Sequence, residues 1–214
     1  MVKKDKKQKE KKSNKRLKEI EEKILKIAIN ISKKGEGALF VINKGKKIEY
    51  SLLIKQEIKP FNVLTPGTEK TLQAIATIDG AVIINKEGII MNYGAMIKKT
   101  KPFVGFGTRH AAAITASKGG NIAILCSEEE HKVKIFRNGK FIMQIDALQK
   151  DIEKDVPKIA NILESIGAGF LGTIGAIALA PTMGIALIPG VIIFGSSYYA
   201  LKTIIKKIKS KRKF

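Results

Sequence analysis

Three short segments of the sequence carry the side chains that could do chemistry. The glycine-flanked segment GFGTRHAAA occupies residues 105–113 and places Thr108, Arg109 and His110 beside backbone N–H groups. A turn of this kind with an arginine next to it can hold phosphate without a Walker loop. Asp79 opens an Asp-Gly-Ala tripeptide, and a Ser-Glu-Glu cluster occupies residues 127–129. The three segments together therefore offer donors for phosphate and carboxylates for a metal ion.

Each segment also has an ordinary structural explanation. Asp79 precedes a glycine, which is typical of a simple turn. Thr108 lies at a predicted strand-to-helix junction, where it could be the N-cap, or where the helix N-terminus, the Thr108 hydroxyl and the Arg109 guanidinium could bind an anion. The acidic run 127–130 follows an apolar strand, where α/β proteins usually place ligands, or it forms a solvated turn.

The elements that must position these segments alternate between helix and strand. Isoleucines at positions 20, 24, 27 and 31 predict an amphipathic helix that ends near Gly35 and packs on the body. A helix is expected at 69–77 and another from Thr108. Strands are predicted at 38–42, 48–54, 81–85, 89–97 and 121–126, and a hairpin turns at Asn138-Gly139 within 132–143. We therefore expect an α/β domain with a mixed central β-sheet flanked by helices.

Composition limits the partners and the chemistry. The net charge is +21, but residues 1–18 contribute +8 and residues 202–214 contribute +7, so the body between them carries only +6. The basic arm 1–18 is poor in apolar residues and is expected to be disordered. The single cysteine, Cys126, excludes an intrachain disulfide and is expected to be a buried thiol. Two histidines are too few for a multi-histidine metal site.

A long apolar segment follows the body. Residues 165–201 contain no charged side chain, and we predict a hydrophobic helical hairpin with arms at 166–180 and 185–201. A hairpin returns the basic tail 202–214 to the cytoplasmic side, beside anionic lipid headgroups. The alternatives are a hairpin buried in a soluble protein, and DNA binding by the two basic tails, although no specific nucleic-acid binding is expected.

The chain is accordingly divided into five parts. The basic arm 1–18 precedes a domain at 19–150, and a linker helix at 151–164 leads to the hairpin 165–201 and the tail 202–214. This division predicts a protein of the cell membrane whose domain at 19–150 is cytoplasmic.

The chemical segments, taken in order, resemble the diadenylate cyclase family (DisA N-terminal-like), in a divergent or archaeal-type form. The resemblance runs from about Gly37 to Ile145 and rests on IDGAVII at 78–84, GTRHAAA at 107–113, LCSEEE at 125–130 and FRNGK at 136–140. It implies condensation of two ATP molecules into cyclic di-AMP and two pyrophosphates, at the face-to-face interface of a homodimer.

The resemblance also implies roles for individual residues. Asp79 and Glu129 would hold the catalytic Mn²⁺ or Mg²⁺, and Thr108, Arg109 and His110 would contact the phosphates. The other nucleotide contacts implied are Gly80, Ala81, Met96, Gly107, Ser127 and Glu128, with Met96 against the adenine.

Two positions depart from the family pattern. The expected second arginine of the Arg-His-Arg segment is Ala111, and an expected acidic residue one turn later is Lys118. Lys118 could restore part of the lost positive charge from the same helix. The alternative function is therefore a nucleotide-binding membrane protein with little or no cyclase activity.

Overall fold

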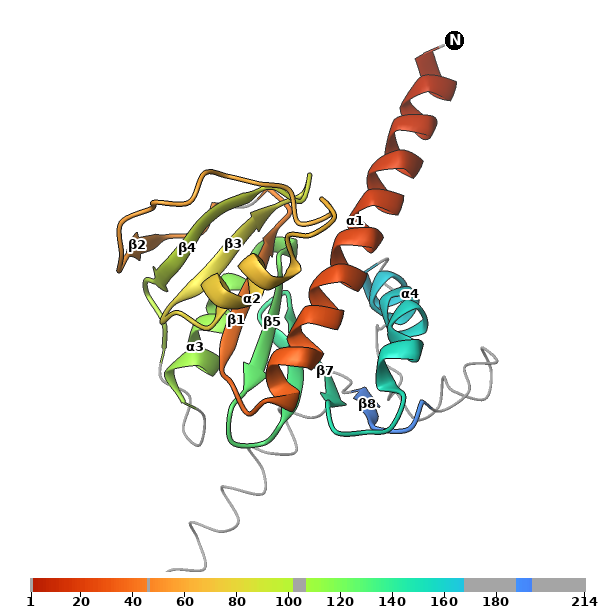
Figure 1. Cartoon of the computed structure of the whole chain (residues 1–214). Coiled ribbons are helices and arrows are strands. Elements are labelled where there is room, and N and C mark those ends of the chain that lie inside the picture. The colour runs from red at the N-terminus through yellow and green to blue at the C-terminus, as the bar shows by residue number, and fades with distance from the viewer. Residues whose placement is uncertain (1, 46, 102–106, 168–187, 194–214) are drawn as a thin grey trace, which may run out of the picture.

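An eight-stranded mixed β-sheet forms the centre of the protein (Figure 1). The computed structural model describes residues 2–45, 47–101, 107–167 and 188–193. Within these residues the strand order is β2-β4-β3-β1-β5-β6-β7-β8, with β1 parallel to β3 and every other neighbouring pair antiparallel. The elements in chain order are α1 (Val2–Lys33), β1 (Ala38–Asn43), β2 (Tyr50–Leu52), α2 (Glu69–Ala76), β3 (Ala81–Asn85), β4 (Ile90–Ile97), α3 (Thr108–Ala116), the 3₁₀ turn η1 (Lys118–Gly120), β5 (Ile122–Ser127), β6 (Lys132–Arg137), β7 (Lys140–Asp146), the 3₁₀ turn η2 (Ile152–Asp155), α4 (Val156–Gly167) and β8 (Val191–Ile193).

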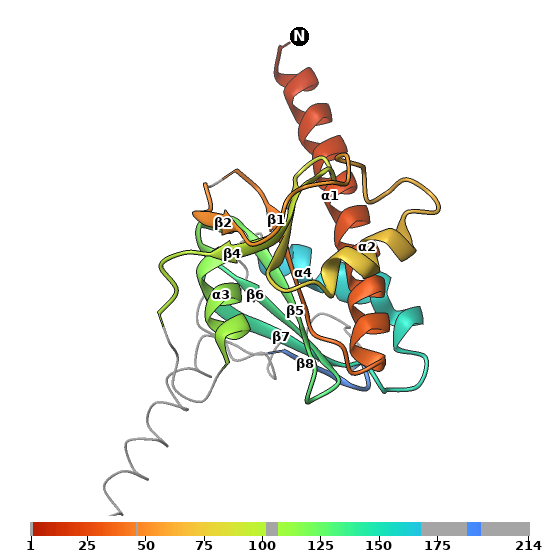
Figure 2. The same cartoon turned by 60° about the vertical axis from the view of Figure 1, so that its left-hand side comes forward.

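Side chains of the central strand β1 alternate between two cores. Phe40 and Ile42 belong to the larger core, which includes buried residues of α1, α2 and α4. Leu39 and Val41 belong to the second core, which includes residues of α3. The helices therefore cover both faces of the sheet, as the two views show (Figures 1 and 2). This arrangement confirms the predicted α/β class with a mixed central sheet.

Helix α1 crosses one face of the sheet. The four predicted isoleucines, at positions 20, 24, 27 and 31, are at most 2% exposed, which confirms the amphipathic helix and its packing on the body. The helix ends at Lys33, and Gly35 follows with a φ of 71°, the left-handed conformation that glycine adopts after a helix.

The disorder predicted for residues 1–18 is wrong, because α1 begins at Val2 and its N-terminal half extends beyond the body (Figure 1). Lysine, glutamate and glutamine are good helix formers, and a helix nucleated by its packed half extends at low cost.

The predicted helices and hairpins of the body are present. Strands β3 and β4 pair around residues 86–88, and β6 and β7 pair around Asn138-Gly139. The helix predicted at 151–164 corresponds to η2 and α4. Val156, Ile159 and Leu163 of α4 are buried in the same core as α1, so this helix packs on the body.

The C-terminal apolar segment differs from the prediction where the structure describes it. Residues 191–193 form strand β8, which pairs antiparallel with β7, so the helical assignment of this part of the hairpin is wrong. Gly190, with a φ of 78°, makes the turn before β8, and the β-branched run that follows suits a strand. The remaining hairpin residues, 168–187 and 194–201, and the tail 202–214 lie outside the described residues. None of the described helices is both long enough and apolar enough to cross a bilayer.

Candidate active site

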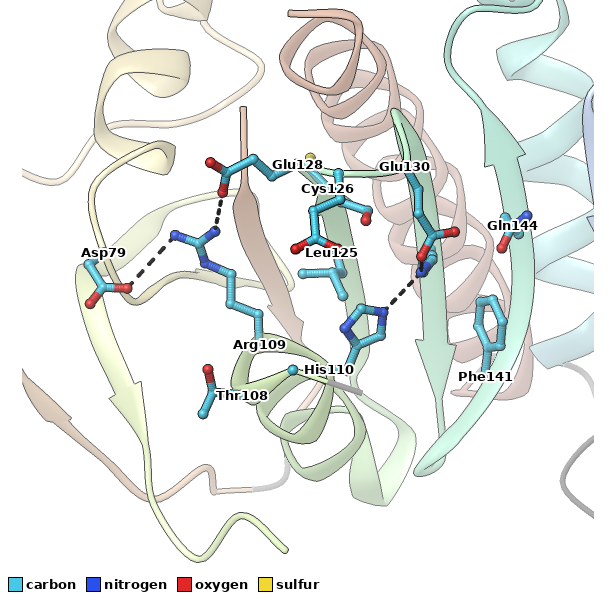
Figure 3. Close-up of a pocket in the computed structure, with 14 residues that line it drawn as sticks. Asp79, Thr108, Arg109, His110, Leu125, Cys126, Glu128, Glu130, Phe141 and Gln144 are labelled. Carbon is cyan, nitrogen blue, oxygen red and sulfur yellow. Dashed lines mark hydrogen bonds and ion pairs between the residues drawn. The ribbon is translucent and has the colours of Figure 1, made fainter. Parts of the chain in front are cut away.

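A polar cavity of about 570 Å³ lies where strand β5 ends and helix α3 begins (Figure 3). Eight of the eleven predicted site residues line it. They are Asp79, Gly107, Thr108, Arg109, His110, Ser127, Glu128 and Glu129. The structure therefore brings together all three chemical segments that were singled out in the sequence.

The pairing of strand β1 explains why these distant segments meet. β1 runs parallel to β3 and antiparallel to β5, with Phe40 opposite Val82 and Ala38 opposite Cys126. The residues just before β3 and those just after β5 consequently lie on either side of the start of β1. Asp79 enters the cavity from one side and Glu128 from the other, and the first turn of α3 supplies the third wall (Figure 3).

The Arg109 guanidinium lies between the two acidic walls. Its Nη1 is 3.3 Å from Oε2 of Glu128, and its Nη2 is 3.9 Å from Oδ1 of Asp79. The Glu128 and Asp79 side chains are 64% and 84% exposed, so each pair contributes at most about 1 kcal/mol. These contacts orient the guanidinium toward the cavity while leaving it able to exchange a carboxylate for a phosphate.

Gly37 makes room for this guanidinium, and sequence reasoning missed it. A β-carbon at position 37 would lie 2.1 Å from Nη1 of Arg109 and 3.1 Å from Oε2 of Glu128. The sequence holds no signal for this role, because Gly37 and Arg109 are far apart in the chain and meet only in the folded domain. Gly37 is therefore a site residue by virtue of the side chain it lacks.

A second polar group lies on the β6 side of the cavity. Nζ of Lys134 is 3.1 Å from Nε2 of His110 and donates a hydrogen bond to the Glu130 carboxylate (Figure 3). Lys134 is only 4% exposed, although its position in the alternating strand β6 gave no sign of burial in a site. Lys132 also donates to Glu130, at 3.3 Å.

The carboxyl group of Glu130 is ionised more easily than usual. Its partial burial would by itself raise its pKa, but the hydrogen bonds and charges of Lys134 and Lys132 outweigh burial and hold the pKa below the ordinary value. Glu130 is therefore the charged partner of both lysines.

Three predicted nucleotide contacts do not line the cavity. Gly80 has a φ of 99°, and a β-carbon there would lie 2.6 Å from the carbonyl carbon of Gly94, so glycine permits the close approach of β4. Its N–H donates to Oδ1 of Asp79 at 3.0 Å and so helps to hold that carboxylate. Ala81 is buried and Met96 is 56% exposed on β4. The roles of Gly80, Ala81 and Met96 in nucleotide binding stay predictions.

The two departures from the family pattern lie outside the polar lining. Ala111 is 5% exposed in the first turn of α3. Lys118 lies beside the β6–β7 turn, where its Cγ would be 3.2 Å from a β-carbon on Gly139. Because Lys118 is not among the residues that line the cavity, it does not replace the charge of the missing arginine there.

Neither a cysteine nucleophile nor a ready-made metal cluster is present in the described part of the chain. Burial raises the pKa of the Cys126 thiol to about 12, and its Sγ donates to the carbonyl of Ala28 at 3.5 Å, so the prediction of a buried, inert thiol is confirmed. Among the described residues no three His, Cys, Asp or Glu side chains cluster closely enough to hold a metal ion by themselves. Asp79 and Glu129 nevertheless present carboxylate oxygens to one cavity.

A helix N-terminus and an arginine beside the ends of central strands suit the binding of an anion such as phosphate. The family model described as "DisA bacterial checkpoint controller nucleotide-binding" (DAC) matches residues 26–141, more than half of the chain. The chain therefore belongs to the DAC family, which confirms the family named from the sequence motifs.

Individual relatives agree with this family. The chain is 30% identical over 139 residues to a diadenylate cyclase of Methanocaldococcus jannaschii, a match that covers 58% of this chain and 44% of the relative. It is 29% identical over 140 residues to a diadenylate cyclase of Haloferax volcanii, covering 58% of this chain and 51% of the relative. The chain thus matches about half the length of these curated relatives.

Two solved structures are also similar. DacA from Staphylococcus aureus aligns with a TM-score of 0.45 and 21% identity, over 65% of this chain and 94% of DacA. A hypothetical membrane spanning protein from Bacillus cereus aligns with a TM-score of 0.42 and 23% identity, over 55% of this chain and 59% of that protein.

Proposed function

We propose that this chain is a diadenylate cyclase, which condenses two ATP molecules into cyclic di-AMP and releases two pyrophosphates. The observation that carries the proposal is the convergence of Asp79, the first turn of α3 and the cluster 127–129 on one cavity. Membership of the DAC family and the similarity to two proteins named diadenylate cyclase support it.

The residues of the cavity would act mainly by positioning and charge neutralisation. In the reaction, the 3′-hydroxyl oxygen of each ATP forms a bond to the α-phosphorus of the other, and the bond from that phosphorus to the pyrophosphate oxygen breaks. Each hydroxyl proton passes to the solvent or to the departing pyrophosphate. Arg109, the Thr108 hydroxyl and the N–H groups of the first turn of α3 would hold the negatively charged phosphates. Fixing the two reactants in this way lowers the entropic part of the barrier.

A divalent cation fits the available donors. Asp79 and Glu129 provide hard carboxylate oxygens, which suit Mg²⁺ or Mn²⁺ and would hold the cation. The cation would supply charge neutralisation at the reacting phosphate. Glu128 is less suited to this role because its carboxylate pairs with Arg109.

The reaction also requires two copies of the chain. Each chain would supply one nucleotide site, whereas ring closure needs two nucleotides with each 3′-hydroxyl near the other's α-phosphate. We therefore propose a face-to-face homodimer, at least transient, in which the two cavities meet.

Product identification tests the proposed activity. Purified chain is incubated with labelled ATP and either Mn²⁺ or Mg²⁺, and the products are separated by chromatography and identified by mass. We expect cyclic di-AMP from the wild type and none from Asp79→Asn. Glu153→Gln, which removes a carboxylate that pairs with Lys33 and does not line the cavity, should leave the yield unchanged. Absence of a cyclic dinucleotide from the wild type under every metal tested would rule out the enzyme.

A binding protein without turnover is the second candidate. Ala111 provides no charge where the family pattern has an arginine, and Lys118 does not line the cavity. The absence of one phosphate donor could cost about 1–3 kcal/mol of transition-state stabilisation. Calorimetry that detects ATP binding in a preparation that makes no product would support this candidate over the cyclase.

We also propose that the chain is attached to the cytoplasmic side of the cell membrane. The support is the uncharged stretch 165–201 together with the basic residues 202–214, which would lie near anionic headgroups. Flotation with anionic lipid vesicles tests this, with a truncation after residue 167 as the control. Recovery of the full chain only in the soluble fraction, together with salt-dependent duplex binding, would favour the DNA-binding alternative.

A further inference from the structure

We propose that Lys134 fixes His110, which lines the cavity, as a neutral imidazole protonated at Nδ1. Lys134 is then a positioning residue, which acts on the ligand through His110. The hydrogen-bond network on the β6 side of the cavity leads to this assignment.

The first step is the charge state of Lys134. Its Nζ donates to the Glu130 carboxylate and lies beside the imidazole of His110. A lysine amine that donates to a carboxylate is present as the ammonium ion. An ammonium group has three donors and no acceptor.

The second step is the tautomer of His110. Because Nζ of Lys134 can only donate, the Nε2 atom that lies 3.1 Å from it must accept with its lone pair. The proton of the neutral ring is then on Nδ1. Uptake of a proton at Nε2 would place two cations in contact and break the hydrogen bond, so His110 is poorly suited to act as a base through that atom.

The third step is the orientation of the ring. Phe136 packs against His110 nearly edge to face, with ring centroids 6.2 Å apart and an angle of 86° between the planes. Lys134 and Phe136 both belong to β6, two residues apart, so they point to the same face of the sheet. Strand β6 therefore orients the imidazole in two ways, through the ring of Phe136 and through the hydrogen bond from Lys134 to Nε2.

This part of the inference rests on the proposed function: a phosphate bound in the cavity would meet a His110 ring whose tautomer is already fixed. A neutral His110 with a fixed proton needs no rearrangement when phosphate arrives, and the ammonium ion behind it adds positive potential to the same wall. Loss of Lys134 should thus weaken ATP binding by releasing His110 from this tautomer.

Nitrogen NMR of the two histidines tests the tautomer directly. In protein labelled with ¹⁵N-histidine, a long-range ¹H–¹⁵N spectrum at pH 8 distinguishes protonated from unprotonated ring nitrogens. His131 is an internal reference, because its Nδ1 lies 2.9 Å from the carbonyl oxygen of Ser32 and must carry a proton. We expect His110 to show the same pattern as His131, with a protonated Nδ1 and an unprotonated Nε2.

The matched variants are Lys134→Met and Lys132→Met. Both remove one β6 lysine that pairs with Glu130, but only Lys134 contacts His110. We expect Lys134→Met to shift His110 toward the Nε2–H tautomer and to leave His131 unchanged, while Lys132→Met leaves both spectra as in the wild type. Lys134→Arg, which retains a cationic donor, should restore the wild-type tautomer in part.

Two results would overturn the inference. One is a protonated Nε2 on His110 in the wild-type protein, which can be observed even if a variant fails to fold. The other is a folded Lys134→Met protein whose His110 spectrum matches the wild type.

The affinity for ATP provides an independent measurement. We expect about a tenfold weaker Kd in Lys134→Met and less than a twofold change in Lys132→Met. If neither the wild type nor any variant binds ATP but the His110 tautomer is as expected, the proposed function fails. The role of Lys134 in positioning His110 then still stands.

Discussion

Replacement of Gly37 by alanine tests whether the space beside Arg109 matters for ligand binding. Gly37 does not have a positive φ, so alanine can adopt its backbone conformation without strain. The new β-carbon would lie 2.1 Å from Nη1 of Arg109, whereas ordinary contacts begin at 3.4 Å. The guanidinium must therefore move by about 1.3 Å, away from its present position against Glu128.

The expected effect is on binding and not on stability. A displaced guanidinium loses a charge-assisted hydrogen bond to phosphate, which is worth about 1.5–3 kcal/mol, so the Kd should rise about 10- to 150-fold. The free energy of unfolding should change by less than about 1 kcal/mol, because the atom that moves is the end of a flexible side chain. Calorimetry with an ATP analogue that carries a methylene group between the α- and β-phosphorus atoms measures binding without turnover.

A double-mutant cycle with Arg109→Ala gives the decisive comparison. If Gly37→Ala acts through the guanidinium, it should have no further effect once that group is gone. An equal loss of affinity in the wild-type and Arg109→Ala backgrounds would refute the steric reasoning. An unchanged Kd for Gly37→Ala alone would refute it as well.

Three further predictions concern the body of the domain. Burial raises the pKa of Glu21 to about 7, in spite of the nearby charges of Lys44 and Arg137. The unfolded chain releases this proton near pH 4.5, so the free energy of unfolding should fall by up to about 3 kcal/mol as the pH rises from 4.5 to 7. Urea unfolding at several pH values measures this fall, which should be absent in Glu21→Gln. Cys126, with a pKa of about 12, should react with a thiol reagent at pH 8 at least about a hundredfold more slowly in the native protein than in denaturant, and equal rates would contradict its burial. Ile24→Ala should cost about 2–5 kcal/mol in denaturant unfolding, whereas Glu19→Ala on the exposed side of α1 should stay within about 0.5 kcal/mol.

Local patterns in the sequence were sufficient for much of the fold. The isoleucine spacing of α1 and the Asn138-Gly139 turn each depend on neighbours within a few residues, and both predictions are confirmed. Residues 191–193 were assigned to a helix because an uncharged stretch of this length suggests a membrane segment. Their β-branched side chains and the preceding Gly190 turn favour the strand that pairs with β7.

The candidate site divides in the same way. Thr108, Arg109 and the acidic cluster could be found because each lies in a short segment that groups phosphate donors or carboxylates close together in the sequence. Gly37 could not, since its role depends on the distance of one missing β-carbon from an arginine far along the chain. Lys134 belongs to an alternating strand, a pattern that normally places lysine in solvent, and only the tertiary structure reveals its burial beside His110.

The placement of the cavity on both sides of β1 has a consequence for synthesis and folding. Asp79, the first turn of α3 and Glu128 come together only after β1 has paired with β3 on one side and with the later strand β5 on the other. A growing chain in which β5 has not yet left the ribosome lacks the wall formed by Glu128, so it has no complete cavity. A ligand of this cavity would therefore bind only the finished sheet and stabilise it against unfolding, by about 1.4 kcal/mol for each tenfold excess of ligand over its Kd.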